Sequence, residues 1–287
     1  MNNKVSELKS KYEKYYLKKF YNLDSFDKCS NANMQIIRIA AEIKSYMKTV
    51  IPQSPVDYSQ FNIANFTGKK KDDKEYIFIL DPEAVKKAKI GIANYCWGIT
   101  DYSSLCELEK DQKKLDNMSL MDIRLKRGSS LTIYSNEKIV PRESSNFNDI
   151  DFTQKPRGRT FAASLIMKEA IKRRAFKGNI SKTYGWISFN QLMSMLQNKE
   201  EEKLMKYRYC DWLVIDDIPP VADISDRHCL YRTSLFDPFF QDRVDMQIPT
   251  ILVLKFNPIN NANLEKQFGT VFRKIVFDNN NFKIEIG

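Results

Sequence analysis

The chain has 287 residues, 43% of them hydrophobic, which is enough to bury a sizeable core in one large domain or two smaller ones. No run of about eighteen uninterrupted apolar residues is present, and the charged start lacks the apolar stretch of a signal peptide, so we expect a cytoplasmic protein. A single histidine and five cysteines without a CxxC pair argue against structural zinc and against a histidine-based catalytic triad.

The formal net charge of +10 is the first indication of a partner. Excess positive charge attracts polyanions such as nucleic acids, because neutralised phosphates release their counterions. Solubility alone is the alternative explanation, and an AT-rich genome would also produce many lysines.

The first 50 residues are expected to be helical, since apolar side chains recur there at helical spacing. The segment is short for an independent core, so it either docks on a partner or caps the larger domain. Residues 51–68 contain two prolines and little periodicity, which is typical of an extended linker.

A helix is expected from Asp81 and Pro82, because an aspartate N-cap followed by proline is a helix start. Residues 101–125 are mixed and helical. SSLTIYS, residues 129–135, reads as a strand, and the polar residues 136–155 form a long loop. The apolar side of residues 160–174 then predicts a helix.

The rest of the chain alternates between strands and helices. Strands are expected at 182–189, 211–215 and 250–254. Helices are expected at 191–197, at 232–244, where the stretch is polar, and at 263–268, with a final strand or hairpin from residue 275 onward. This alternation predicts an α/β fold with a parallel sheet between helical layers.

The sharpest motif is WLVIDD, an apolar run that ends in Asp216 and Asp217. A buried parallel strand has this pattern at its ligand-binding edge. In such sites one carboxylate holds Mg²⁺ and the next polarises the attacking water. A buried strand followed by an acidic turn is the alternative.

The corresponding phosphate loop is sought between a strand and a helix, and the candidate is TQKPRGRT, residues 153–160. Gly158 and Thr160 fit the pattern G-x-x-x-x-G-K-[ST], whereas Thr153 replaces its first glycine and Arg159 its lysine. An ordinary basic helix start is the alternative. We expect residues 158–160 and the two aspartates to lie together at the tips of adjacent strands.

From residue 51 onward the chain resembles the DnaC/DnaI/IstB-like branch of AAA+ ATPases. The resemblance is carried in order by LDPEAVKKAKIGIANY, SSLTIYS, GRTFAASLIMKEAIKRR, YGWISFNQLMSML, YCDWLVIDDI, FQDRVDMQIPTILVLKFNP and NLEKQFGTVFRKI. It implies an AAA+ domain at 51–287 with an insertion at 136–155, a small helical partner-docking domain at 1–50, and no C-terminal helical lid.

The same resemblance implies residue roles around ATP or ADP and Mg²⁺. Thr160 would ligate Mg²⁺ and Asp216 would hold it, while Asp217 would orient the attacking water. Asn257 would sense the γ-phosphate. Arg273, with Arg243 as the second choice, would act in trans on a neighbouring subunit's nucleotide. Gly158 and Arg159 complete the nucleotide site, and the incomplete loop leaves open whether the chain is a weak ATPase.

A basic cluster spans the loop and the helix that follows it, with Glu169 as its one acid. Its members are Lys155, Arg157, Arg159, Lys168, Lys172, Arg173, Arg174 and Lys177. Lys168, Lys172, Arg173, Arg174 and Lys177 are the candidates for contacting the phosphates of single-stranded DNA. A solvated helix face is the alternative.

By this resemblance the leading hypothesis is a phage or bacterial helicase loader. It would bind a hexameric replicative helicase and single-stranded DNA and associate with copies of itself. One alternative is an IstB-like ATPase that regulates transposition or recombination. Another is a catalytically inactive DNA-binding protein derived from an AAA+ domain.

Overall fold

A computed structural model describes residues 63–66, 82–135, 158–176, 184–220 and 226–286. The expected docking segment at 1–50, nearly all of the linker, the insertion at 136–155 and Lys177 lie outside these residues. The division into two domains therefore stays a prediction.

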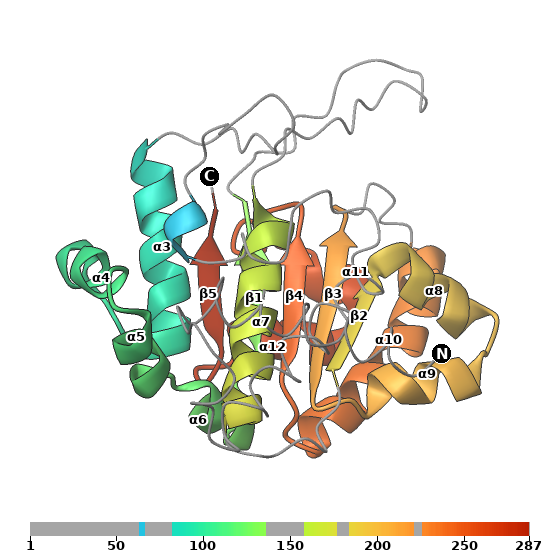
Figure 1. The fold of residues 1–287 in the computed structure, drawn as a ribbon. Coiled ribbons are helices and arrows are strands. Elements are labelled where there is room, and N and C mark those ends of the chain that lie inside the picture. The colour runs from blue at the N-terminus through green and yellow to red at the C-terminus, as the bar shows by residue number, and fades with distance from the viewer. Residues whose placement is uncertain (1–62, 67–81, 136–157, 177–183, 221–225, 287) are drawn as a thin grey trace, which may run out of the picture.

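Five parallel strands form the centre of the molecule, in the order β2-β3-β4-β1-β5 (Figure 1). They are β1 (Leu131–Tyr134), β2 (Tyr184–Ser188), β3 (Trp212–Ile218), β4 (Thr250–Leu254) and β5 (Phe282–Glu285). The helices are α3 (Pro82–Trp97), α4 (Tyr102–Leu108), α5 (Gln112–Met118), α6 (Met121–Lys126), α7 (Arg159–Phe176), α8 (Phe189–Gln197), α9 (Glu201–Arg208), α10 (Asp226–Asp245), α11 (Leu264–Phe268) and α12 (Thr270–Phe277), with a short 3-10 helix η3 (Ile63–Asn65). The expected α/β fold with a parallel sheet between helices is confirmed.

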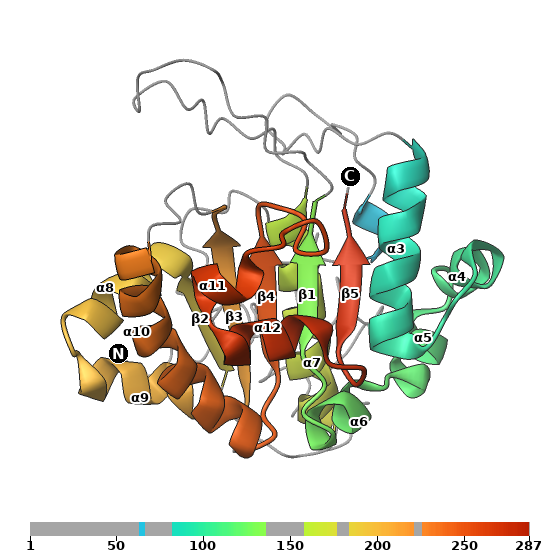
Figure 2. The same ribbon diagram turned by 180° about the vertical axis from the view of Figure 1, so that it is seen from behind.

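Helices cover both faces of the sheet, and alternate side chains along each strand are therefore buried in one of two cores. On β3, Trp212 and Val214 join the core under α3 and α7, whereas Leu213 and Ile215 join the core under α8, α10, α11 and α12. Figure 1 shows α7 in front of the sheet, and Figure 2 shows α10, α11 and α12 on the opposite face. The continuous apolar run of the sequence is thus explained by two cores.

Several elements begin or end where local chemistry dictates. Ser188 caps α8 in a capping box with Gln191, so this helix starts directly at the end of β2. Gly269, with φ +99°, ends α11 and precedes α12. A positive φ is incompatible with a continuing α-helix and is most easily adopted by glycine. Gly269 therefore separates α11 from α12.

Three expectations for the second half of the chain need correction. The carboxylates do not follow β3 but lie inside it, since the strand continues to Ile218 through a register shift against β4. The helix expected to be polar, α10, buries Phe236, Phe239 and Phe240 in the core. Residue 275 belongs to α12, so the last strand begins only at Phe282 and is a parallel strand rather than a hairpin.

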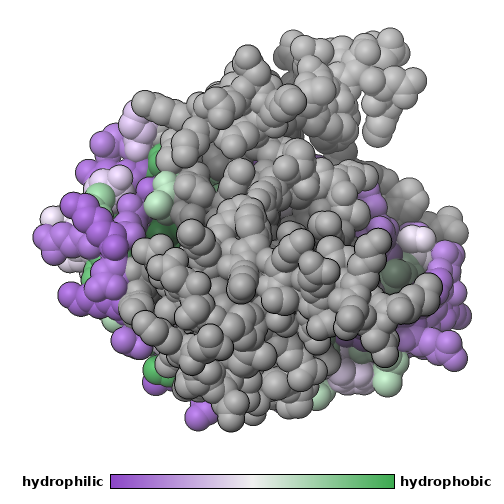
Figure 3. Space-filling model, viewed as in Figure 1, coloured by the Kyte–Doolittle hydropathy of each residue, from purple (hydrophilic) through white to green (hydrophobic). Residues whose placement is uncertain are grey.

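The flanks of the sheet carry mainly polar side chains. On the face seen in Figure 3, the visible surface of α4 and α5 on one side and of α8 and α9 on the other is largely hydrophilic. Among the described residues, no helix has the length and apolar character needed to cross a membrane.

Candidate functional site

The strand order creates a topological switch point at the carboxyl edge of the sheet, between β1 and β4. The chain leaves β1 through α7 toward β2 on one side, and leaves β4 through α11 and α12 toward β5 on the other. The two connections run over opposite faces, as Figures 1 and 2 show. A crevice where connections diverge in this way is where open α/β sheets bind ligands.

Thr160 and Asp216 meet at this edge. Thr160 lies in the first turn of α7, and its Oγ1 donates a hydrogen bond to Oδ1 of Asp216 over 3.3 Å. Gly158, just before the helix, has φ +81°, a conformation that glycine adopts without strain. The expected meeting of residues 158–160 with the acidic motif is therefore observed. Their strands are not adjacent, however, because β4 lies between β1 and β3.

Asp216 lies in an environment that disfavours its charged form. The residue is buried, and burial together with the negative charge of Asp217 raises the pKa of Asp216 to about 6. The Thr160 hydroxyl, the backbone N–H of Asp217 and the ammonium of Lys255 oppose this shift. A cation bound here would relieve the repulsion between the two aspartates.

Asp217 is more exposed and is held by an ion pair. Its Oδ1 lies 2.7 Å from Nζ of Lys255, which directly follows β4. Asp217 also has φ +68°, in the left-handed region, at the register shift between β3 and β4. The carboxylate expected to orient water is thus neutralised by a lysine that the sequence motifs did not identify.

Arg159 does not replace the missing phosphate-loop lysine in a simple way. Its side chain is buried, and Nη1 donates a hydrogen bond to Oγ of Ser135, the residue after β1. The guanidinium therefore ties the start of α7 to the tip of β1. Ser135 was not identified from the sequence, although its place at the end of the strand SSLTIYS was a signal.

The resemblance assigned roles at a nucleotide to both Asn257 and Arg273. The structure places these two residues in different parts of the fold. Asn257 follows β4, and its Oδ1 accepts a hydrogen bond from the backbone N–H of Ile259 over 2.9 Å. Arg273 is 55% exposed on α12, and its Nε lies 3.7 Å from Oε2 of Glu265. An exposed arginine can contact another subunit, so the in trans role of Arg273 stays a prediction.

Arg243 cannot act in trans on a neighbouring subunit, because it is fully buried. Its guanidinium donates to the Oγ1 of Thr250 and to the carbonyl oxygens of Pro249, Tyr207, Arg208 and Cys210. These bonds tie the end of α10 to the start of β4 and to the segment that precedes β3. The second-choice arginine finger is therefore a structural residue.

The basic cluster expected on α7 is only partly described. Lys168 is buried, with 8% of the residue exposed, so it does not lie on an exposed helix face that could track DNA phosphates. The backbone of Lys172, Arg173 and Arg174 is helical, but their side chains lie outside the described part of the chain, as does the whole of Lys177. Their contact with DNA stays a prediction.

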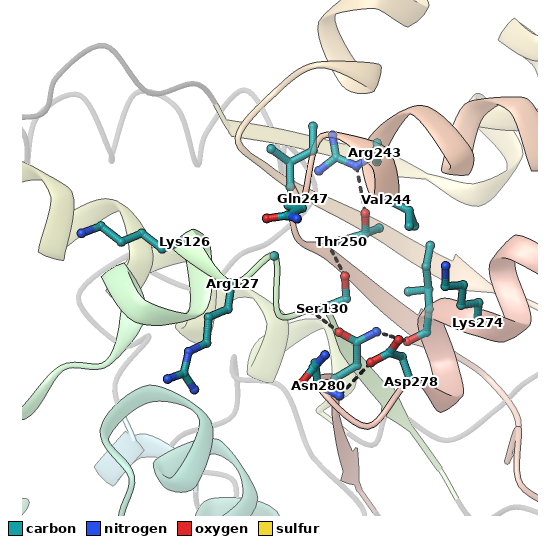
Figure 4. A pocket seen from close by; sticks show the side chains of 14 residues that line it. Lys126, Arg127, Ser130, Arg243, Val244, Gln247, Thr250, Lys274, Asp278 and Asn280 are labelled. Atoms are coloured by element: carbon teal, nitrogen blue, oxygen red, sulfur yellow. Dashed lines mark hydrogen bonds between the residues drawn. The ribbon is translucent and has the colours of Figure 1, made fainter.

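A separate hollow of about 510 Å³ lies at the opposite, amino edge of the sheet (Figure 4). Its lining comes from the residues before β1, β4 and β5 and includes Lys126, Arg127, Lys274 and Asp278. Hydrogen bonds from Arg243 to Thr250, from Thr250 to Ser130 and from Ser130 to Asn281 cross its wall. The acidic motif does not line it, so it is distinct from the switch point at the carboxyl edge.

The side chains at the carboxyl edge fit a nucleotide with Mg²⁺. A hydroxyl and a carboxylate are the oxygen ligands that Mg²⁺ takes alongside phosphates and water, and Thr160 and Asp216 supply them. Within the described residues no cluster of three or more histidine, cysteine or acidic side chains is placed to hold a metal.

Fold and site together define a parallel α/β protein with a topological switch point at the carboxyl edge, consistent with a P-loop or AAA+ fold. No protein-family model matches the chain, and no curated protein matches it. A solved structure of DnaI is similar to it, with a TM-score of 0.38 and 17% sequence identity, and the match covers 62% of this chain and 86% of DnaI. The description of the fold and of the site depends on the strand order and the contacts above, and not on this likeness.

The raised pKa of Asp216 predicts a pH-dependent penalty on stability. The ordinary value is 3.8 and the folded value about 6, so the folded chain binds this proton more tightly than the unfolded chain. Stability from this residue therefore falls as the pH rises from about 4 to about 6 and stays low above that. We expect Asp216→Asn to raise the free energy of unfolding by about 2 kcal/mol near neutral pH, and by much less below pH of about 4.

Urea denaturation of the wild type and Asp216→Asn between these pH values measures this difference. Asp278→Asn, at the opposite edge of the sheet, serves as the control. A gain from Asp216→Asn that does not change with pH would show that packing, and not ionisation, causes it.

Proposed function

We propose that this chain is a helicase-loader-like protein whose AAA+-like domain binds a nucleotide at the carboxyl edge of its sheet. The observation that carries the nucleotide site is the hydrogen bond between Thr160 and Asp216, which joins the start of α7 to β3 across β4. A helix start beside a buried carboxylate at a switch point is an arrangement that binds phosphate and Mg²⁺.

In this proposal Thr160 and Asp216 hold Mg²⁺, which when bound neutralises charge on the phosphates of ATP or ADP. The backbone N–H groups in the first turn of α7, which begins directly after Gly158, would contact the same phosphates. Asn257 follows β4 and contacts the terminal phosphate. We propose slow turnover, because the phosphate loop has Thr153 in place of its first glycine and Arg159 in place of its lysine.

Arg273 is proposed to complete the site of a neighbouring subunit. Its exposure on α12 and the weak 3.7 Å pairing with Glu265 support this role, because an exposed ion pair costs little to break. Copies of the chain would then associate through their AAA+-like domains, and nucleotide would order that contact.

The proposed macromolecular partners are a hexameric replicative helicase and single-stranded DNA. Residues 1–50 are proposed to dock on the helicase, and the net charge of +10 supports binding to DNA phosphates. The basic end of α7, with Lys172, Arg173 and Arg174, is the proposed DNA contact.

The full chain should bind a purified hexameric replicative helicase and increase its unwinding of a DNA fork whose single strand is coated by a binding protein. A chain lacking residues 1–50 should lose both effects and keep nucleotide binding. Association of the full chain with a transposase and not with the helicase would instead support the IstB-like alternative. Binding to neither would refute the loader proposal.

Binding to a labelled single strand tests the second partner by fluorescence anisotropy at several salt concentrations. We expect the affinity to fall steeply with salt, because each phosphate contact releases a counterion. Replacing Lys172, Arg173 and Arg174 together by glutamine should weaken binding about tenfold or more and flatten the salt dependence. Unchanged binding would show that these three residues do not form the DNA contact.

A further inference from the structure

Phosphate groups need nearby positive charge, and among the residues that the structure describes at the carboxyl edge Arg159 and Lys255 are the cations to consider. Asp216 and Asp217 are adjacent carboxylates at this edge, and their negative charges repel each other. A phosphate brought to this edge without a cation would add to the repulsion. In the loop pattern G-x-x-x-x-G-K-[ST] a lysine reaches the β and γ phosphates, and this chain has no lysine at that position.

Arg159, which stands in the lysine's place, is committed to the protein itself. It is buried and bonded to Ser135 at the tip of β1. A guanidinium is a planar fork, and turning it to another partner would leave the buried Ser135 hydroxyl without this donor. Arg159 therefore serves to anchor the helix start.

Lys255 is the cation that the fold brings to the carboxyl edge from another direction. It directly follows β4, the strand that lies between β1 and β3. Its backbone N–H donates to the carbonyl oxygen of Ile218 over 2.8 Å, which fixes the base of the side chain beside the acidic motif. Its Nζ lies 2.7 Å from Oδ1 of Asp217, and 29% of the side chain is exposed, so the ammonium faces an accessible edge.

We propose that Lys255 contacts the terminal phosphates of the nucleotide in place of the missing phosphate-loop lysine, and that Asp217 holds it until nucleotide binds. A lysine ammonium is a point charge on a flexible stem, so it can turn from a carboxylate to a phosphate without moving the backbone. A triphosphate carries more negative charge than one carboxylate and competes for the ammonium. This inference rests on the proposed nucleotide site.

The exchange has a consequence for Asp217. Once Lys255 turns to the phosphates, the carboxylate of Asp217 loses its ion-pair partner and can accept a hydrogen bond from water. The same lysine thus joins phosphate binding to the exposure of the acid expected to orient water. A lysine that only stabilises the register shift between β3 and β4 would have neither effect.

Nucleotide affinity of the full chain tests the proposal by competition against a fluorescent ATP analogue, with Mg²⁺ and with EDTA. Lys255→Met should weaken ATP binding about tenfold in both conditions, the usual value of a charge-assisted hydrogen bond, and should change AMP binding less than about twofold. Lys255→Arg should retain part of the difference between ATP and AMP. Lys274→Met, at the opposite edge, is the matched control and should change nothing.

Asp217→Asn gives the opposite sign and keeps the proposal testable if Lys255→Met does not fold. Removing the competing carboxylate should tighten ATP binding about threefold or more in EDTA, because Lys255 is no longer held. If the wild type binds ATP but Lys255→Met and Asp217→Asn bind it equally well, Lys255 has no such role and the nucleotide site still stands. If the wild type binds no nucleotide, the site itself is wrong and this inference falls with it.

Discussion

Replacing Arg243 by methionine is expected to lower the free energy of unfolding by about 3–5 kcal/mol, the largest effect on stability that we predict. The guanidinium donates to the Oγ1 of Thr250 over 2.8 Å, to the carbonyl of Pro249 over 2.7 Å and to the carbonyls of Tyr207 and Cys210 over 2.8 and 2.9 Å. Methionine is also unbranched and fills part of the space, but it leaves these buried acceptors without donors.

Urea denaturation measures this loss, and Arg273→Met is the matched control. Arg273 is 55% exposed, and its contacts with Glu265 and with the ring of Phe277 lie at the surface, so its replacement should change stability by less than about 1 kcal/mol. A loss below about 1 kcal/mol for Arg243→Met would contradict the structural role that we assign to this arginine.

Asp216→Ala is expected to weaken ATP binding about 100-fold in the presence of Mg²⁺. Loss of a hydrogen-bonded partner around a metal ligand already costs tenfold to about 100-fold, and Asp216 is proposed as a ligand itself. In EDTA the same change should leave ATP affinity equal or slightly higher, because one negative charge is removed from the phosphate site. The dependence on Mg²⁺ separates metal binding from damage to the fold.

Isothermal titration of ATP with and without Mg²⁺ measures both affinities. Asp278→Ala is the control, since Asp278 lines the hollow at the amino edge. Equal losses for Asp216→Ala in Mg²⁺ and in EDTA would remove Asp216 from the proposed metal site.

The strands and the main helices follow from short-range patterns in the sequence. Continuous apolar runs predicted β3 and β4, since strands buried on both faces need no polar side. The helical spacing of residues 160–174 predicted most of α7, which spans Arg159–Phe176. A local pattern was enough to predict these elements, because the apolar residues on the buried side of a helix or strand recur every few positions.

The features that could not be predicted from the sequence depend on contacts between distant segments. The place of β4 between β1 and β3 is set by crossover connections, which leave no local pattern. Arg243 lies among charged neighbours in the sequence, and only packing against the segments before β3 and β4 shows that it is buried. The ion pair between Lys255 and Asp217 likewise joins the residue after β4 to a residue of β3, at a register shift that the sequence does not reveal.

Hydrogen–deuterium exchange of the full chain with and without Mg²⁺ and ATP tests the central claim most directly. Peptides covering residues 158–164 and 212–218 should become protected, because the proposed phosphates contact the start of α7 and the acidic part of β3. Peptides from the hollow at the amino edge outside α12, residues 126–130 and 278–281, should not change. Protection confined to that hollow, or no protection anywhere, would contradict a nucleotide site between Thr160 and Asp216.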